Sequence, residues 1–201
     1  MMRPVPALDA ARLPDFAFGH RSILWWGTVG FMATEGMAFA IAAAAYLYLR
    51  TRVPEWPPGV PPPELGYGIA NLVVLIVSLI PNQLAKNASE KCDLPRVRLW
   101  LIVCLVFAAA FLALRVFEIA GLNVRWDFNA YGSIQWAILG LHTTHLITDV
   151  GDTAVLTVLM FTGPVSGKRF VDVSENAFYW YFVVASWLPL YALIYWGPRL
   201  L

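Results

Sequence analysis

Charged residues are scarce in this sequence. Asp, Glu, Lys and Arg make up 13% of its 201 residues, whereas an average water-soluble domain contains about 25%. The formal net charge is +1, so the concentration of basic charge that nucleic-acid-binding domains carry is missing. Because 59% of the residues are hydrophobic, we infer that lipid covers much of the surface, and we expect no nucleic-acid partner.

Cysteine and histidine are also too few to build a redox centre. Cys92 falls in a polar connection and Cys104 in an apolar run, so we expect them at different membrane depths and not in a disulfide. The three histidines are His20, His142 and His145. No haem-attaching C-x-x-C-H and no glycine-rich nucleotide loop occurs. We therefore expect this chain to hold no haem, copper or other cofactor of its own.

The first 22 residues lack an uninterrupted apolar core. Charged residues recur along this segment, at Arg3, Asp9, Arg12, Asp15 and Arg21. A cleavable signal peptide needs a continuous hydrophobic stretch. We predict that residues 1–22 form an N-terminal surface segment.

Long apolar runs fill the rest of the chain. A membrane-spanning helix needs about 20 mostly apolar residues, and five stretches meet or approach that length. They cover residues 23–49, 65–85, 97–120, 133–161 and 177–196. The sequence thus predicts an all-α fold, an integral membrane bundle of five transmembrane helices in a single domain over residues 23–197.

Aromatic and charged residues mark the ends of these spans. Trp25 and Trp26 open the first span and Arg50 closes it, while Trp180 lies near the start of the fifth. Tryptophan favours the membrane interface, so we expect these residues to anchor the helices there or to contact phospholipid headgroups. Glu175 precedes the fifth span, where a negative charge would stabilise the helix start through its dipole.

Basic residues are unequally shared between the two sides of such a bundle. The N-terminal segment and the second and fourth connections carry nine Lys and Arg residues, and the other side carries five. Cytoplasmic loops are enriched in positive charge. We predict a cytoplasmic N-terminus and an outside C-terminus.

Glu35 lies near the middle of the first span. A carboxylate in hydrocarbon is costly unless it is neutral, paired or facing water, so Glu35 should point into the bundle, protonated or hydrogen-bonded to the fourth span. Linking two helices and handling protons are both open roles. Two rows of small residues on the same helix predict close helix contacts. These rows are Gly36, Ala40 and Ala44, and Thr34, Ala38 and Ala42.

The fourth span carries a polar stripe. At about 100° per residue, His142, His145, Asp149 and Asp152 fall within an arc of about 80°, and Gln135 shares that face. Three interpretations stay open: a metal site, a proton or ion path, and a hydrogen-bonded network that joins helices. We favour the network, because one helix rarely supplies all the ligands of a metal and no other span clusters His or Cys.

A second candidate pair lies at the end of the third span. Arg115 and Glu118 are three residues apart, which places them on one helix face within reach of each other. We interpret them as an interfacial ion pair. We also count Glu118 in the predicted buried polar network, whose other members are Glu35, His142, His145, Asp149 and Asp152.

Several motifs, taken together and in order, resemble subunit III of the haem-copper oxidases, specifically its short five-helix bacterial form. The segment 25–50 with its Thr34-Glu35 pair is similar to that family's helix with a buried glutamate. The matching features that follow are the Trp-Pro-Pro-Gly at 56–59, Asn71, Glu118, Tyr131-Gly132-Ser133, Gly140-Leu141-His142-x-x-His145, and Glu175 to Phe182 with Trp187.

The resemblance implies a non-redox subunit of a proton-pumping terminal oxidase in a bacterial inner membrane. In that family, oxygen is reduced to water at haem and copper in partner subunits. Subunit III binds phospholipids, packs against subunit I (and II), and supports proton uptake and durable turnover. Departures from the family pattern occur at five positions: Leu141, Asp149, Asp152, Tyr181 and Val184.

Two alternatives stay open, the first because of these departures and the second because of the polar stripe. The partner could be a nitric oxide reductase, whose accessory subunits share the fold. In a different functional class, the chain could be a free-standing proton or metal transporter that uses the stripe of the fourth span.

Overall fold

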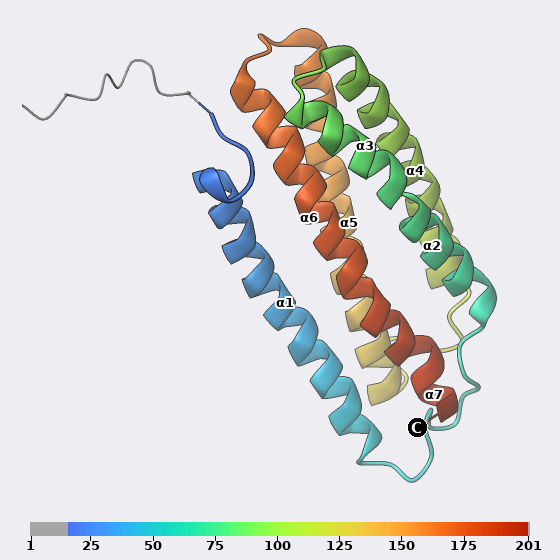
Figure 1. The fold of residues 1–201 in the computed structure, drawn as a ribbon. Coiled ribbons are helices and arrows are strands. Elements are labelled where there is room, and N and C mark those ends of the chain that lie inside the picture. The colour runs from blue at the N-terminus through green and yellow to red at the C-terminus, as the bar shows by residue number, and fades with distance from the viewer. Residues whose placement is uncertain (1–15, 201) are drawn as a thin grey trace, which may run out of the picture.

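The computed structural model describes residues 16–200, and these residues are almost wholly helical without a strand (Figure 1). After a short 3₁₀ turn, η2 (Gly19–Arg21), six longer helices follow. They are α1 (Ile23–Arg50), α2 (Leu65–Val77), α3 (Leu79–Glu90), α4 (Leu94–Ala120), α5 (Ala130–Thr162) and α6 (Gly167–Tyr191). A π-helical segment, η3 (Ala192–Trp196), and a final turn, α7 (Gly197–Leu200), end the described chain.

Five helical stretches in the described chain are long and apolar enough to cross a membrane, so the all-α, five-span prediction is confirmed. The first, third and fourth spans lie within three residues of the predicted limits. The fifth begins at Gly167, ten residues before the predicted start. Hydrophobicity marks the part of a helix that lies in hydrocarbon, and α6 starts in a polar stretch outside it.

The second span is interrupted at Ser78, between α2 and α3. Pro81 follows three residues later and has no N–H to donate to the Val77 carbonyl, so the helical ladder cannot run through unbroken. The Ser78 hydroxyl donates to the Leu75 carbonyl at 2.6 Å. The two helices nevertheless form one span, Leu65–Glu90.

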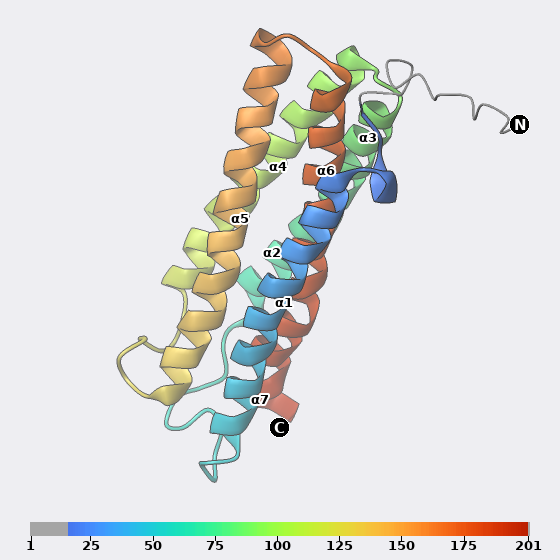
Figure 2. The same ribbon diagram turned by 90° about the vertical axis from the view of Figure 1, so that its left-hand side faces the viewer.

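The helices pack side by side as an elongated bundle. α1 contacts α5 and α6, and α3 lies against α4 and α6, as Figures 1 and 2 show from two sides. The start of α1, the α3–α4 connection and the α5–α6 connection share one end of the bundle, and the chain's C-terminal turn lies at the other.

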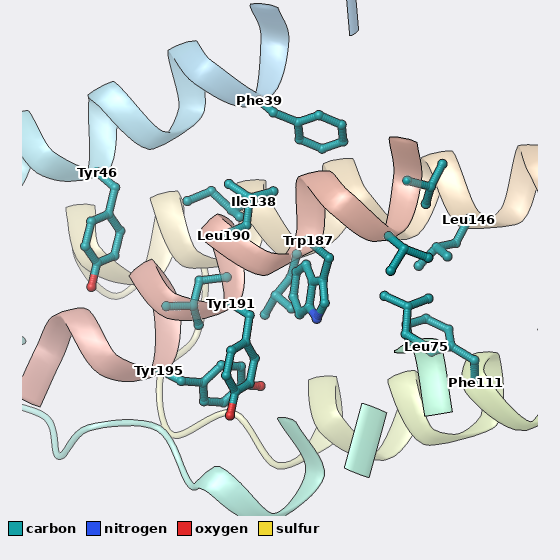
Figure 3. Packing of buried hydrophobic residues seen from close by; sticks show 14 of the residues in the cluster. Phe39, Tyr46, Leu75, Phe111, Ile138, Leu146, Trp187, Leu190, Tyr191 and Tyr195 are labelled. Atoms are coloured by element: carbon teal, nitrogen blue, oxygen red, sulfur yellow. The ribbon is translucent and has the colours of Figure 1, made fainter. Parts of the chain in front are cut away.

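The core is aromatic and aliphatic. Trp187 is fully buried at its centre, with Phe39 from α1, Leu75 from α2, Phe111 from α4 and Leu146 from α5 around it (Figure 3). All the packed spans thus contribute side chains to one cluster, which sets the helix faces that carry the polar residues.

α1 is the least buried span of the bundle. Contrary to our expectation, its small-residue rows are mostly exposed within this chain: Ala38, Ala40 and Ala44 are exposed, and only Gly36 and Ala42 are partly buried. The contact face is instead formed by the larger Phe39 and Tyr46, which are buried. On α1, large side chains therefore make the main contacts with the neighbouring helices, and close approach of the helix backbones contributes less.

Candidate functional site

Glu35 joins three helices. Its Oε1 lies 3.2 Å from His145 Nε2 on α5, and its Oε2 accepts a 2.6 Å hydrogen bond from the Tyr179 hydroxyl on α6. The Glu35 side chain is 16% exposed. Phe39, one turn further along α1, covers the imidazole with ring centroids 4.7 Å apart. The carboxyl therefore points inward and has a partner on each of the two neighbouring helices.

The same imidazole is oriented by its own helix. His145 Nδ1 lies 2.7 Å from the Leu141 carbonyl, and that oxygen can only accept. Nδ1 is therefore the protonated nitrogen, and Nε2 faces the Glu35 carboxyl. A carboxyl, an imidazole and a phenol in a row are groups that can pass a proton among themselves.

His142 belongs to a different environment from His145. It is fully buried, its ring stacks on Trp187 with centroids 4.4 Å apart, and its Nδ1 lies 3.3 Å from Arg115 Nη2. Guanidinium can only donate, so Nδ1 accepts, and Nε2 donates to the Val183 carbonyl at 3.1 Å. His142 is thus a fixed neutral ring that bridges α4 and α6.

Arg115 and Glu118 form the pair that we inferred, 2.9 Å apart, but not at the interface. Both side chains are only 1% exposed. Asn71 on α2 and Tyr195 on η3 each donate a short hydrogen bond to Glu118. The interfacial interpretation was wrong because α2 and the π segment cover this end of α4, which the one-helix argument could not foresee.

The two aspartates of α5 share one partner on α6. Asn176 Nδ2 lies 3.4 Å from Asp149 Oδ1 and 3.1 Å from Asp152 Oδ2, and its Oδ1 accepts from Thr153 at 3.0 Å. Asp149 is buried, but Asp152 is exposed. Asp152 is therefore not part of a buried core, because it lies at the edge of the stripe's arc, beyond the α5–α6 contact.

A groove of about 730 Å³ runs between α1, α5 and α6. Glu35 and His145 lie at its inner end, and Arg169 and Asp172 of the first α6 turns lie at its outer end. Its polar wall comes from the α5–α6 seam. The polar lining comprises Thr28, Glu35, Thr144, His145, Thr148, Asp149, Asp152, Arg169, Asp172, Glu175, Asn176 and Tyr179.

Two further residues lie elsewhere than predicted. Glu175 sits in the third turn of α6 and is buried, so it cannot stabilise the helix start, since the dipole effect fades after the first turn. Trp180 is also buried and donates to Ser78 at 2.9 Å; it is no interfacial anchor. Both errors follow from placing the fifth helix too late.

The residues at the ends of the first span lie near the surface. Trp26 is 60% exposed and donates to the His20 carbonyl. Trp25 stacks on Phe178 of α6 with ring centroids 5.7 Å apart. Arg50, at the last position of α1, donates to the Val53 carbonyl at 3.3 Å.

The residues of the predicted polar stripe therefore lie in three different environments, although they share one helix. His142 faces α4 and α6, His145 faces α1, and the aspartates face Asn176. Among residues 16–200, no group of three or more His, Cys, Asp and Glu side chains is placed to hold a metal. Sequence reasoning missed Asn176 and Tyr179. Their spacing of three residues places them on one face of the last helix, and this spacing could have indicated that both face the polar residues of the other helices.

Comparison with known proteins agrees with this architecture. The family model for cytochrome c oxidase subunit III matches residues 19–198. The cytochrome c oxidase subunit 3 of Thermostichus vulcanus is 27% identical over 97% of this chain and 98% of its own length. The probable cytochrome c oxidase subunit 3 of Nocardia farcinica is 31% identical over 84% of this chain and 85% of its own.

A third relative is a fusion. The haem-copper oxidase subunit I+III of Aeropyrum pernix is 28% identical over 87% of this chain, which matches 22% of that longer protein. The family match extends over both the Glu35 helix and the polar span that pairs with it. The chain is a multi-pass membrane protein that belongs to the cytochrome c oxidase subunit III family.

Proposed function

We propose that this chain supports proton uptake and durable turnover in a haem-copper oxidase whose haem and copper lie in other subunits. The observation that carries the proposal is the Glu35 site: a carboxyl, an imidazole and a phenol joined across α1, α5 and α6 in a chain of this family. The relatives bear oxidase names, which does not favour a nitric oxide reductase partner or a free-standing transporter.

The Glu35 site is suited to hold a proton, not to move electrons. One Glu35 oxygen contacts His145 and the other contacts Tyr179. A proton that binds to Glu35 can therefore pass between the carboxyl and these two side chains without a large rearrangement. The groove gives the site a polar approach from one end of the bundle. We infer that Glu35 buffers protons close to where the oxidase takes them up.

Subunit I is the partner that we propose for this chain. The Aeropyrum pernix relative joins subunits I and III in one polypeptide. Because fused subunits lie in the same complex, we infer that the separate chains contact each other as well. We extend the proposal to subunit II only as a member of the same complex.

Phospholipid is the second proposed partner, and it would lie along the outward face of α1. Met37 and Ile41 expose their side chains there, in a helix of 28 residues, long enough to match a bilayer. We expect Trp26, near one end of α1, and Arg50, at the other, to contact the headgroups.

Replacement of Glu35 tests the proton role in the intact oxidase complex. We expect Glu35→Gln and Tyr179→Phe to slow proton uptake and to shorten the period of active turnover, because each removes a proton-sharing group. Glu64→Gln is the matched control, since Glu64 is exposed at the start of α2 and caps no N–H there. Proton uptake and the inactivation rate are measured in reconstituted vesicles.

The role fails if the Glu35→Gln complex assembles normally and matches the control in both measurements. In that case the Glu35 contacts serve only to hold α1 against the bundle. A Tyr179→Phe complex that behaves like wild type while Glu35→Gln does not would remove the phenol from the proposal.

A further inference from the structure

A second, much smaller space lies between the helices of the bundle, beside the groove. It occupies about 20 Å³ where the α2–α3 break meets α4, α5 and α6. On the same measure a single water molecule needs roughly 10–15 Å³ and two to four polar partners. The space is therefore large enough for one water. Its polar lining comprises Ser78, Asn82, Asp149, Thr153 and Asn176.

Asp149 lacks partners that its burial requires. Its side chain is buried, and the 3.4 Å contact with Asn176 is the one hydrogen bond that the described residues give it. A buried carboxyl with a single long hydrogen bond is costly. The cavity is where a further donor could reach it.

The protein groups around the cavity are already committed to other partners. The Ser78 hydroxyl donates to Leu75 and accepts from Trp180. Asn82 Nδ2 donates to the Ala177 carbonyl at 2.9 Å, and Thr153 donates to Asn176. A rearrangement of these side chains would break existing bonds to serve Asp149. A water molecule would serve it without that loss.

Asp149 and Asn176 lie between the two spaces, because both residues line the small cavity and the groove. Asp152, the other partner of Asn176, lines the groove but not the small cavity. One side of the Asp149–Asn176 pair thus meets the small cavity, and the other side meets the groove that ends at Glu35.

We propose that the small cavity holds one ordered water molecule bound to Asp149, and that the Asp149–Asn176 pair is the passage through which this water exchanges with the groove. The site follows from the packing of this chain alone. It holds whether or not Glu35 supports proton uptake.

Electron cryomicroscopy of the complete oxidase complex, at a resolution that shows ordered water, tests the site. We expect one density peak within hydrogen-bond distance of the Asp149 carboxyl in wild type and in the control Asp152→Asn. Ala108→Val adds two carbons to the cavity wall without touching a polar group, and we expect the peak to be lost. A dry cavity in wild type would overturn the proposal, as would a peak that persists unmoved in Ala108→Val.

Radiolytic labelling with ¹⁸O water tests the exchange. Trp180 lines the cavity but not the groove, so ¹⁸O incorporated into Trp180 soon after mixing reports exchange of the internal water. Thr148→Trp places a large ring in the groove, and we expect it to abolish rapid labelling while the water peak remains. Labelling of Trp180 that is absent in wild type, or unchanged in Thr148→Trp, would contradict the passage.

Discussion

At the scale of the residue, the Arg115–Glu118 pair is buried together with two groups that donate to Glu118, Asn71 and Tyr195. Three polar groups, one each from α4, α2 and η3, surround the Glu118 carboxylate. Removal of one member of a buried ion pair leaves the other charge without compensation, whereas removal of both members is often tolerated.

We expect Glu118→Gln to destabilise the protein by about 3–5 kcal/mol, because the Arg115 charge is then buried without a counter-charge. The double change Arg115→Met with Glu118→Gln should recover part of the loss. Thermal unfolding of the complex in detergent measures both. Equal melting temperatures for the single variant and wild type would contradict the account.

An exposed pair in the α4–α5 connection supplies the control. Arg125 donates to Asp127 through Nε and Nη2 at 3.0 and 2.9 Å, and these hydrogen bonds hold the pKa of the Asp127 carboxyl below its usual value. This pair is therefore also intact at neutral pH. Asp127→Asn should leave the melting temperature unchanged, since solvent screens exposed pairs.

Individual residues were predictable from the sequence where one helix determined them. The spacing of Arg115 and Glu118 predicted their contact, and the midspan position of Glu35 predicted an inward side chain. Depth was predicted only in part, because Glu118 is buried as expected and Asp152 is exposed. Whether such a residue is buried depends on which helix covers it, and no periodicity within one helix contains that information.

At the scale of the element, a close contact between α2 and the π segment sets the position of Tyr195. A Cβ added at Gly68 would lie 2.5 Å from the Tyr195 ring carbon Cζ. Gly66, in the same helix, has nothing within 4 Å of such a Cβ. The two glycines therefore separate the effect of packing from that of helix propensity.

We expect Gly68→Ala to lower stability, because the Tyr195 ring must move and its hydrogen bond to Glu118 is disturbed. Gly66→Ala should instead raise stability slightly, by about 0.5–1 kcal/mol, through helix propensity alone. Thermal unfolding of the two variants gives the comparison. If both changes shift the melting temperature in the same direction, Gly68 is not a packing position.

The helices themselves were largely predictable, because long apolar runs determine which segments enter a bilayer. The break at Ser78 and the early start of α6 were not predicted. The break needs the combined effect of Pro81 and the Ser78 hydroxyl, and α6 starts among polar residues that hydropathy excludes. Because α6 starts early, Glu175 and Trp180 lie further along the helix than predicted, and both are buried.

At the scale of the whole molecule, the orientation in the membrane stays a prediction, and a native residue can test it. Cys92 is exposed in the α3–α4 connection, at the end of the bundle where α1 starts. We expect a membrane-impermeant maleimide to label Cys92 in inside-out vesicles and not in right-side-out vesicles. Cys92→Ser should abolish the signal.

A cysteine at the opposite end completes the topology test. Asn123 is exposed in the α4–α5 connection, so Asn123→Cys in a Cys92→Ser background should show the reverse labelling pattern. Labelling of Cys92 from the outside would reverse the proposed topology and place the open end of the groove on the wrong side for cytoplasmic proton uptake.

The membership of this chain in an oxidase complex is tested most directly by a visible spectrum of what it binds. The chain carries an affinity tag, the native membrane is solubilised gently, and the purified material is examined. We predict haem absorption from a co-purifying subunit I. A colourless oligomer of this chain alone, with no haem in any fraction that contains it, would contradict the account.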